Sequence, residues 1–356
     1  MTIFPLLAAL LPALALAATP QWNLSSALNF HYPDIPVAWN LRDVLLYAVS
    51  IGAQVANQTL VDDPNFAVFP SYATALSFKG TSYSFSASIP DLPYLDVFQE
   101  PARAGLILPR AVTMVQSLAF RIFQIPSQFN RLSERDKKVQ DSQYIEPYLP
   151  LPNDSGPVPW TIKKRIISVE ERVNPSSLII GNELVLFNPK GVKYTRLIAT
   201  TKYFGGTANG FNFSASIAVG IKPKPVPSRA PDLQIRIPVS PIETLIYRLN
   251  GDYNALHVDP SVGLKFGYGG LVLHALSYFG FSAFQLVGHL GGGDVASLHS
   301  MQGAFGLPIS PGDDLLLKAW EVGHGPHRTK EITFVVEDLT KKTIVLDRAA
   351  AFIRRK

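Results

Sequence analysis

The sequence predicts an α+β protein built from two related halves. Strand-like runs rich in β-branched and aromatic residues are separated by short turns, a spacing typical of antiparallel sheets. Each half also contains a stretch with a helical apolar pattern, at residues 35–54 and 271–288. Between the halves, residues 222–231 contain four prolines, which indicates an extended linker.

Composition excludes several classes of protein. The chain has 356 residues, of which 47% are hydrophobic and 17% charged, so it has enough apolar material for a large core and is not a disordered protein. Its net charge is +5, but Lys and Arg are spread thinly, and we expect no nucleic-acid partner. The absence of cysteine excludes disulfides, thiolate nucleophiles and cysteine metal sites.

Residues 1–18 form an apolar leader that ends in small residues of the kind a signal peptidase accepts. A cleaved signal, a membrane-associating leader and an uncleaved extension are the alternatives. A working leader implies the secretory pathway or a membrane, and otherwise we expect a cytoplasmic protein, since the C-terminus is not a peroxisomal address. The remaining chain divides into an N-terminal half (19–221), the linker (222–231) and a C-terminal half (232–356).

The first half begins with the helix predicted over residues 35–54 and a proline-bracketed turn at 62–70. A strand is predicted over 77–89, and a helix over 111–123 with a charged, solvated continuation at 131–141. Turn residues then separate three predicted strands, at 160–173, 178–187 and 192–204.

The second half shows a similar order of elements. A strand at 232–239 leads into a short helix at 241–249, an irregular segment and the long apolar helix at 271–288. Four further strands are predicted, at 298–305, 315–322, 329–337 and 343–353.

The irregular segment carries the residues best suited to chemistry. Asp252, Asn254 and His257 lie within six residues, between Gly251 and Pro260, which both resist regular helix. A short irregular segment can direct three side chains to one point. Aspartate and histidine are the usual pair for proton transfer near neutral pH. The alternative is a structural turn that retains these residues without a function.

The same stretch resembles a known family. Tyr247-Arg-Leu-Asn-Gly-Asp-Tyr-Asn-Ala-Leu-His-Val-Asp-Pro260 and Leu271-Val-Leu-His-Ala275 are similar to the signature of the MaoC-like, type-2 enoyl-CoA hydratases, which have the hot-dog fold. Further similarity lies at Asp63-Pro-Asn-Phe-Ala-Val-Phe-Pro70 and Pro308-Ile-Ser-Pro-Gly-Asp313, among other segments, and covers most of the chain except the leader and residues 91–142. The resemblance implies a double hot dog, in which two antiparallel sheets each wrap around a central helix and the N-terminal half is degenerate.

The resemblance also implies roles for individual residues. Asp252 and His257 match the catalytic pair, Asn254 the supporting polar residue, and the backbone N–H of Ala275 the oxyanion donor. Gly251 and Tyr253, the two neighbours of Asp252, are expected to contact the substrate. The family usually has Pro at the position of Ala255 and Gly at that of Ala275, so the stiffness of the segment and the room beside the thioester carbonyl differ here.

The implied function is that of a hydro-lyase, a hydratase or dehydratase acting on a 2-enoyl or 3-hydroxyacyl thioester. CoA or the phosphopantetheine of an acyl-carrier protein would be part of the substrate, and no separate cofactor is expected. A polyketide-type or other specialised intermediate, or ring closure by a substrate hydroxyl, are variants within this class. A secreted or lumenal hot-dog protein that binds a hydrophobic ligand without catalysis is the alternative, and a homodimer is left open.

Other motifs favour structural interpretations. His274 is interpreted as a core histidine, and His324 and His327 as parts of a hairpin turn, so no metal site is expected. The glycines near residues 267–270 and 291–293 lack dinucleotide spacing. The aromatic stretch 90–129, with Phe120 and Phe123, is the material expected to line a pocket for the acyl chain.

Overall fold

A long antiparallel sheet dominates the molecule. The computed structural model describes residues 31–53, 66–81, 138–173, 176–204, 212–215 and 220–354. Within these residues, eleven strands form one sheet in the order β1-β3-β4-β5-β2-β8-β11-β10-β9-β7, with β6 paired to β3. The strands are β1 Ile35–Val37, β2 Lys138–Pro147, β3 Trp160–Val173, β4 Ser176–Phe187, β5 Lys193–Phe204, β6 Phe213–Ser214, β7 Leu233–Pro238, β8 Leu298–Phe305, β9 Asp314–His324, β10 Lys330–Asp338 and β11 Thr343–Ile353.

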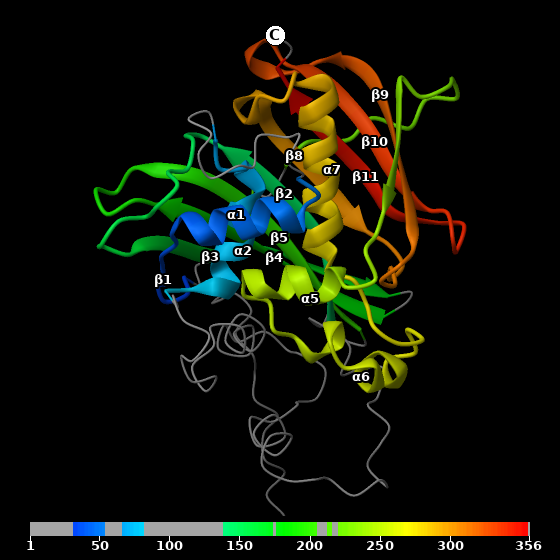
Figure 1. Ribbon diagram of the computed structural model, residues 1–356, viewed down its shortest axis with the longest axis horizontal. Helices are drawn as coiled ribbons and strands as arrows, with labels where there is room; N and C mark the ends of the chain where they lie inside the picture. The colour runs from blue at the N-terminus through cyan, green and yellow to red at the C-terminus, as the bar shows by residue number, and fades with distance from the viewer. Residues whose placement is uncertain are drawn as a thin grey trace, which may run out of the picture.

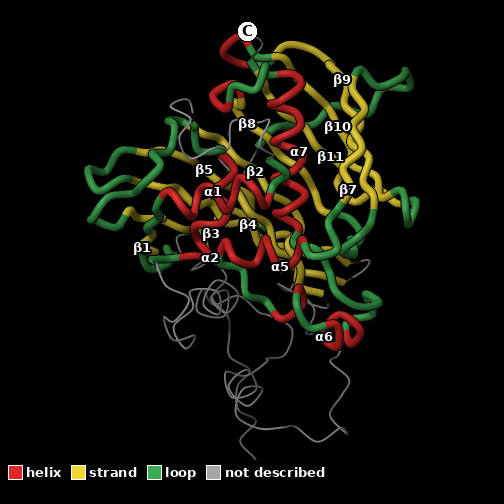
Figure 2. The backbone as a smooth tube through the Cα atoms, viewed as in Figure 1, coloured by secondary structure: helices red, strands yellow, loops and turns green. Residues whose placement is uncertain are grey.

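Two halves meet in the middle of this sheet. β2 of the first half pairs with β8 of the second, with Ile145 opposite Met301, so the two half-sheets are continuous. Each half places a helix across its strands: α1 (Leu41–Ser50) over the first and α7 (Ala275–Leu290) over the second (Figure 1). The shorter helices are α2 (Ala73–Lys79), α5 (Glu243–Tyr247) and α6 (Pro260–Lys265). In the view of Figure 2, α2 lies below α1, α5 lies near the start of α7, and α6 lies beyond α5. This is the double hot-dog arrangement, in the α+β class.

The two central helices pack closely against each other. α7 is apolar on nearly all sides and is buried along most of its length, as expected for a helix enclosed by sheet and neighbouring helix. At Gly280 an added Cβ would come within 2.4 Å of Ile51 Cγ2, so a glycine is required for α1 and α7 to approach this closely. One core cluster therefore spans both halves and includes Tyr47 and Phe279.

Most of the predicted strands are confirmed. The three strands predicted at 160–204 are β3, β4 and β5, and those at 298–305 and 343–353 are β8 and β11. The strands predicted at 232–239, 315–322 and 329–337 correspond to β7, β9 and β10. The predicted hairpin turn is confirmed as well, since His324 ends β9 and His327 lies in the turn before β10.

Four predicted elements need correction. Residues 35–37 form β1 and not helix, because they pair with β3 and because Asn40 starts α1 with a capping box: its side chain accepts from Asp43 N, and Asp43 accepts from Asn40 N. Ser77 lies in α2 rather than at the start of a strand. Residues 138–141 begin β2 and do not continue a helix, since β5 and β8 supply pairing partners. α7 begins at Ala275, after residues 271–274, which form neither helix nor strand.

Some sequence-based expectations lie outside the described residues, namely the leader, the predicted helix at 111–123, and Phe120 and Phe123. The proline-rich residues 222–231 form neither helix nor strand and run along the second half-sheet. There the indole N–H of Trp320 donates to the Arg229 carbonyl at 3.0 Å, and the Thr333 hydroxyl donates to the Lys224 carbonyl at 3.1 Å. Among the described residues, no helix combines the length and hydropathy that crossing a membrane requires.

Candidate active site

The irregular segment of the second half is held against the first half by Gly251. This residue follows a 3₁₀ turn at Arg248–Asn250 and has φ of 118°, in the region that favours glycine. An added Cβ would also lie 2.6 Å from both the backbone N and the Cα of Lys79 in α2. Gly251 therefore sets the path of the chain into the site, rather than offering a side chain to a substrate.

Asp252 and Asn254 shape the next turn through their side chains. The Asn254 backbone N–H donates to Asp252 Oδ1 at 3.2 Å, and Asn254 Oδ1 accepts from the Leu256 N–H at 3.1 Å. The second bond caps a 3₁₀ turn over Ala255–His257, so the chain turns here without the proline usual in the family. The structure thus places Asn254 as a support for the backbone that carries His257.

His257 is buried, and its ring is oriented by the backbone. Nδ1 lies 2.7 Å from the carbonyl oxygen of Val272. Because a carbonyl oxygen only accepts, Nδ1 carries the hydrogen in the neutral ring, which leaves the lone pair on Nε2. A buried histidine with a free Nε2 lone pair is equipped to take a proton.

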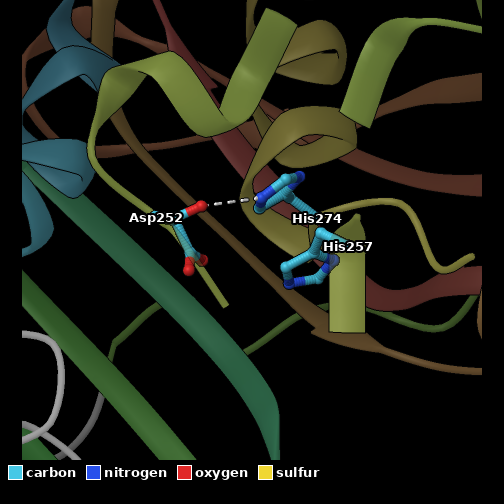
Figure 3. Close-up of side chains that lie close together, drawn as sticks. All are labelled: Asp252, His257 and His274. Atoms are coloured by element: carbon cyan, nitrogen blue, oxygen red, sulfur yellow. Dashed lines mark hydrogen bonds between the residues drawn. The ribbon is translucent and has the colours of Figure 1, made fainter. Parts of the chain in front are cut away.

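His274 completes the cluster, which Figure 3 shows. It is the N-cap residue of α7, 1% exposed, and its Nε2 lies 3.3 Å from the backbone oxygen of Asp252. The His274 ring stacks on that of His257, with ring centroids 3.6 Å apart. The centroid of the Tyr247 ring lies 5.0 Å from that of His274. Ligand-type side-chain atoms of Asp252, His257 and His274 all lie within 4.8 Å of one another.

Burial changes the proton affinities in this cluster. It raises the pKa of Asp252, while the charge of His257 and the Asn254 N–H bond act in the opposite direction. It lowers the pKa of His274 well below the usual value, and the proximity of His257 lowers it further. Asp252 thus tends to hold a proton more readily than an exposed aspartate, and His274 stays uncharged near neutral pH.

The same three residues have the composition of a metal site, but their arrangement suits proton transfer better. The imidazole planes are inclined by only 23° and separated by 3.6 Å between centroids. Nitrogen lone pairs lie in their ring planes, so two nearly parallel stacked rings do not direct them to one ion. Nδ1 of His257 and Nε2 of His274 also face carbonyl oxygens.

Ala275 is the first residue of α7, directly after His274. The first N–H groups of a helix have no partner within it, and the helix dipole favours negative charge there. Its N–H therefore has the properties of an oxyanion donor. Tyr253 lies beside this segment, with the Arg248 guanidinium 5.3 Å from the centre of its ring.

Sequence reasoning missed two features of the site. His274 was interpreted as a core histidine and is indeed buried, but it also contacts both members of the proposed pair. Glu243 was not singled out, although it is 5% exposed and its Oε1 accepts from the Ser277 hydroxyl, at 3.4 Å, in the first turn of α7. The sequence did offer a signal for both: His274 directly precedes Ala275, and Glu243 lies only a few residues before the Asp252 segment.

Comparisons with known proteins agree with this geometry. Residues 223–343 match the family model described as MaoC like domain. The chain is 28% identical over 298 residues to the probable dehydratase NIT22 of Ajellomyces capsulatus, covering 83% of this chain and 71% of that one. It is 27% identical to the peroxisomal enoyl-CoA hydratase 2 of Arabidopsis thaliana, covering 85% and 88%. It spans 25% and 42% of the mouse and fly multifunctional enzymes that it also matches.

Among solved structures, the MaoC-like dehydratase of Phytophthora capsici superimposes with a TM-score of 0.72 at 23% identity. The superposition covers 94% of this chain and 99% of that one, which shows the shared fold. The family model covers the residues that build the cluster, from Glu243 to Ala275. The second half of the chain therefore contains a MaoC-like dehydratase domain, within a double hot-dog fold that spans both halves.

Proposed function

We propose that this enzyme adds water to 2-enoyl-CoA thioesters and, in reverse, dehydrates 3-hydroxyacyl-CoA thioesters. One observation carries the proposal. A carboxylate oxygen of Asp252 lies within 4.8 Å of a ring nitrogen of His257, and the lone pair of His257 is on Nε2. The names of the Ajellomyces and Arabidopsis relatives support the same reaction class.

The chemistry needs one group to accept a proton and another to supply one. His257 Nε2 takes a proton from water as the water oxygen bonds to the β-carbon, and the electron pair of the double bond moves toward the thioester carbonyl. Protonated Asp252 then delivers its proton to the α-carbon. The proton on His257 returns to Asp252, so the pair holds one proton at the start and at the end.

Negative charge develops on the thioester oxygen between these steps. The Ala275 N–H at the start of α7 is the donor that we assign to this oxygen, since a preorganised N–H in a buried site stabilises such charge strongly. The methyl group of Ala275 occupies space beside the donor. We infer that the enzyme accepts substrates selectively at this point, which is compatible with a specialised acyl group.

A direct assay tests the proposal. The purified full-length chain is incubated with crotonyl-CoA and with longer trans-2-enoyl-CoAs, and the loss of the enoyl absorbance is followed. We expect turnover with at least one chain length and a kcat lower by a factor on the order of 10² to 10⁴ with Asp252→Asn. Carrier-bound 3-hydroxyacyl chains are the second substrate set. Tight binding of acyl chains without turnover in either set would favour the non-catalytic ligand-binding alternative.

A further inference from the structure

A basic pocket lies on the first half-sheet, away from the catalytic cluster. It has a volume of about 450 Å³, and its lining includes Lys163 and Arg165 of β3, Glu183 and Phe187 of β4, and Lys193 and Arg196 of β5. This volume is within the range of small-molecule sites, roughly 300–1,000 Å³. We call this group of residues the basic pocket.

The strand register places the basic pocket on the face opposite α1. Trp160, Ile162 and Leu184 belong to the core that the helices cover. Because side chains alternate along a strand, Lys163, Arg165 and Glu183 lie on the other face, and Arg165 pairs directly with Glu183 across β3 and β4. α7, with His274 and Ala275 at its start, lies on the helix-covered face of the sheet (Figure 1).

Two guanidinium groups in the basic pocket are fixed by one buried carboxylate. Glu183, whose side chain is 7% exposed, accepts from Arg165 Nε through Oε2 and from Arg196 Nε through Oε1, both at 2.7 Å. The Nε side of each guanidinium is thus held by Glu183. A guanidinium with a fixed orientation is well suited to bind a phosphate group. Glu183 offsets one of these charges, and Glu146, whose Oε2 lies 3.6 Å from Arg196 Nη1, offsets part of the other. The excess positive charge therefore comes from Lys163 and Lys193, which are exposed.

An aromatic surface adjoins these cations. Lys163 Nζ lies 5.5 Å from the centre of the Phe187 ring, and the half-buried Phe187 lines the basic pocket. Nucleic bases stack on aromatic side chains, while phosphates bind to Lys and Arg. We propose that the basic pocket binds a nucleoside diphosphate group, either as a free nucleotide or as the nucleotide end of CoA.

Binding by the full-length chain is the first test. ADP, adenosine and inorganic phosphate are titrated by calorimetry at low and at raised salt. We expect ADP to bind more tightly than adenosine, to weaken as salt increases, and to weaken at least tenfold in Lys163→Gln/Lys193→Gln, which changes two exposed side chains. Lys318→Gln, which removes a cation paired with Glu337 in the second half-sheet, is the matched control and should bind ADP as the wild type does.

The proposal is wrong if ADP does not saturate the chain at millimolar concentration, or if the double variant binds ADP as well as Lys318→Gln does. Enzyme kinetics then distinguish a free nucleotide from the nucleotide end of CoA. This kinetic experiment rests on the proposed function. If the double variant has a higher KM for crotonyl-CoA but not for crotonyl-pantetheine, the basic pocket binds the nucleotide end of the CoA substrate. If the double variant loses ADP binding but keeps both KM values, the ligand of the basic pocket is a free nucleotide and not the substrate. Failure of the enzyme to turn over either thioester leaves the ADP titration intact.

Discussion

The imidazole of His274 stacks on that of His257, with ring centroids 3.6 Å apart and planes inclined by 23°. His274 is held by its Nε2 at the Asp252 backbone oxygen, and burial keeps it uncharged. A neutral ring against His257 lets His257 gain a proton without a second imidazolium beside it. The contact also restricts rotation of His257, whose other restraint is the Val272 carbonyl.

If this stacking orients His257 for catalysis, substitutions at His274 should lower kcat. We expect His274→Ala to lower kcat about tenfold or more, because His257 loses the surface that orients it, while KM changes little. His274→Phe keeps a flat ring and should retain more activity than the alanine variant. Equal losses in both would show that the nitrogen atoms of His274, and not its stacking, are what the reaction needs.

The proposed proton-transfer pair makes a second expectation. Asp252→Asn and His257→Ala should each lower kcat by a factor on the order of 10² to 10⁴. The double variant should lose far less than the product of the two, since the residues act as a unit. The measurement is kcat for the three variants on one enoyl-CoA, with circular dichroism as the folding control. Multiplicative losses would contradict a shared proton.

Glu243 should make the stability of the protein pH-dependent. Burial raises the pKa of its carboxyl to about 8, and the Ser277 hydroxyl only partly offsets this. Because the folded-state pKa is raised, the stabilising contribution is full below the ordinary pKa of 4.5 and is lost as pH rises toward 8. We expect Glu243→Gln to remove this loss, so that its melting temperature exceeds that of the wild type at pH 8 but not at pH 5. Parallel melting curves across this range would count against a buried, protonated Glu243.

The halves are also joined by a buried hydrogen bond. Asn250 Nδ2 donates to the Ser50 hydroxyl at 2.8 Å and to the Tyr247 carbonyl at 3.0 Å, with both side chains at most 4% exposed. Removing the Asn250 amide breaks both of these bonds, although the Ser50 hydroxyl still donates to the Tyr47 carbonyl, and at roughly 0.5–1.5 kcal/mol per bond the loss is about 1–3 kcal/mol. We therefore expect Asn250→Ala to lower the free energy of unfolding by that amount in urea titrations. Ser50→Ala serves as the second arm of a double-mutant cycle, and additive losses would mean that the bond does not couple the halves.

The sequence by itself determined most strands and was sufficient to propose the catalytic pair. β3, β4 and β11 were predictable because runs rich in β-branched residues lie between turn residues, and this pattern is local. Asp252 and His257 could be proposed as the catalytic pair for the same reason, since a motif within six residues needs no knowledge of the fold.

Only the tertiary structure decided the features that depend on distant partners. β2 is polar for much of its length, and its strand conformation follows from pairing with β5 and β8. Ile35–Val37 extends because β3 accepts it as an edge neighbour. His274 joined the site because α7 begins where Asp252 passes, and Lys163, Arg165 and Arg196 became one pocket because three strands aligned them. The physical reason is that local sequence sets backbone preference, whereas pairing and close packing between remote segments set which side chains meet.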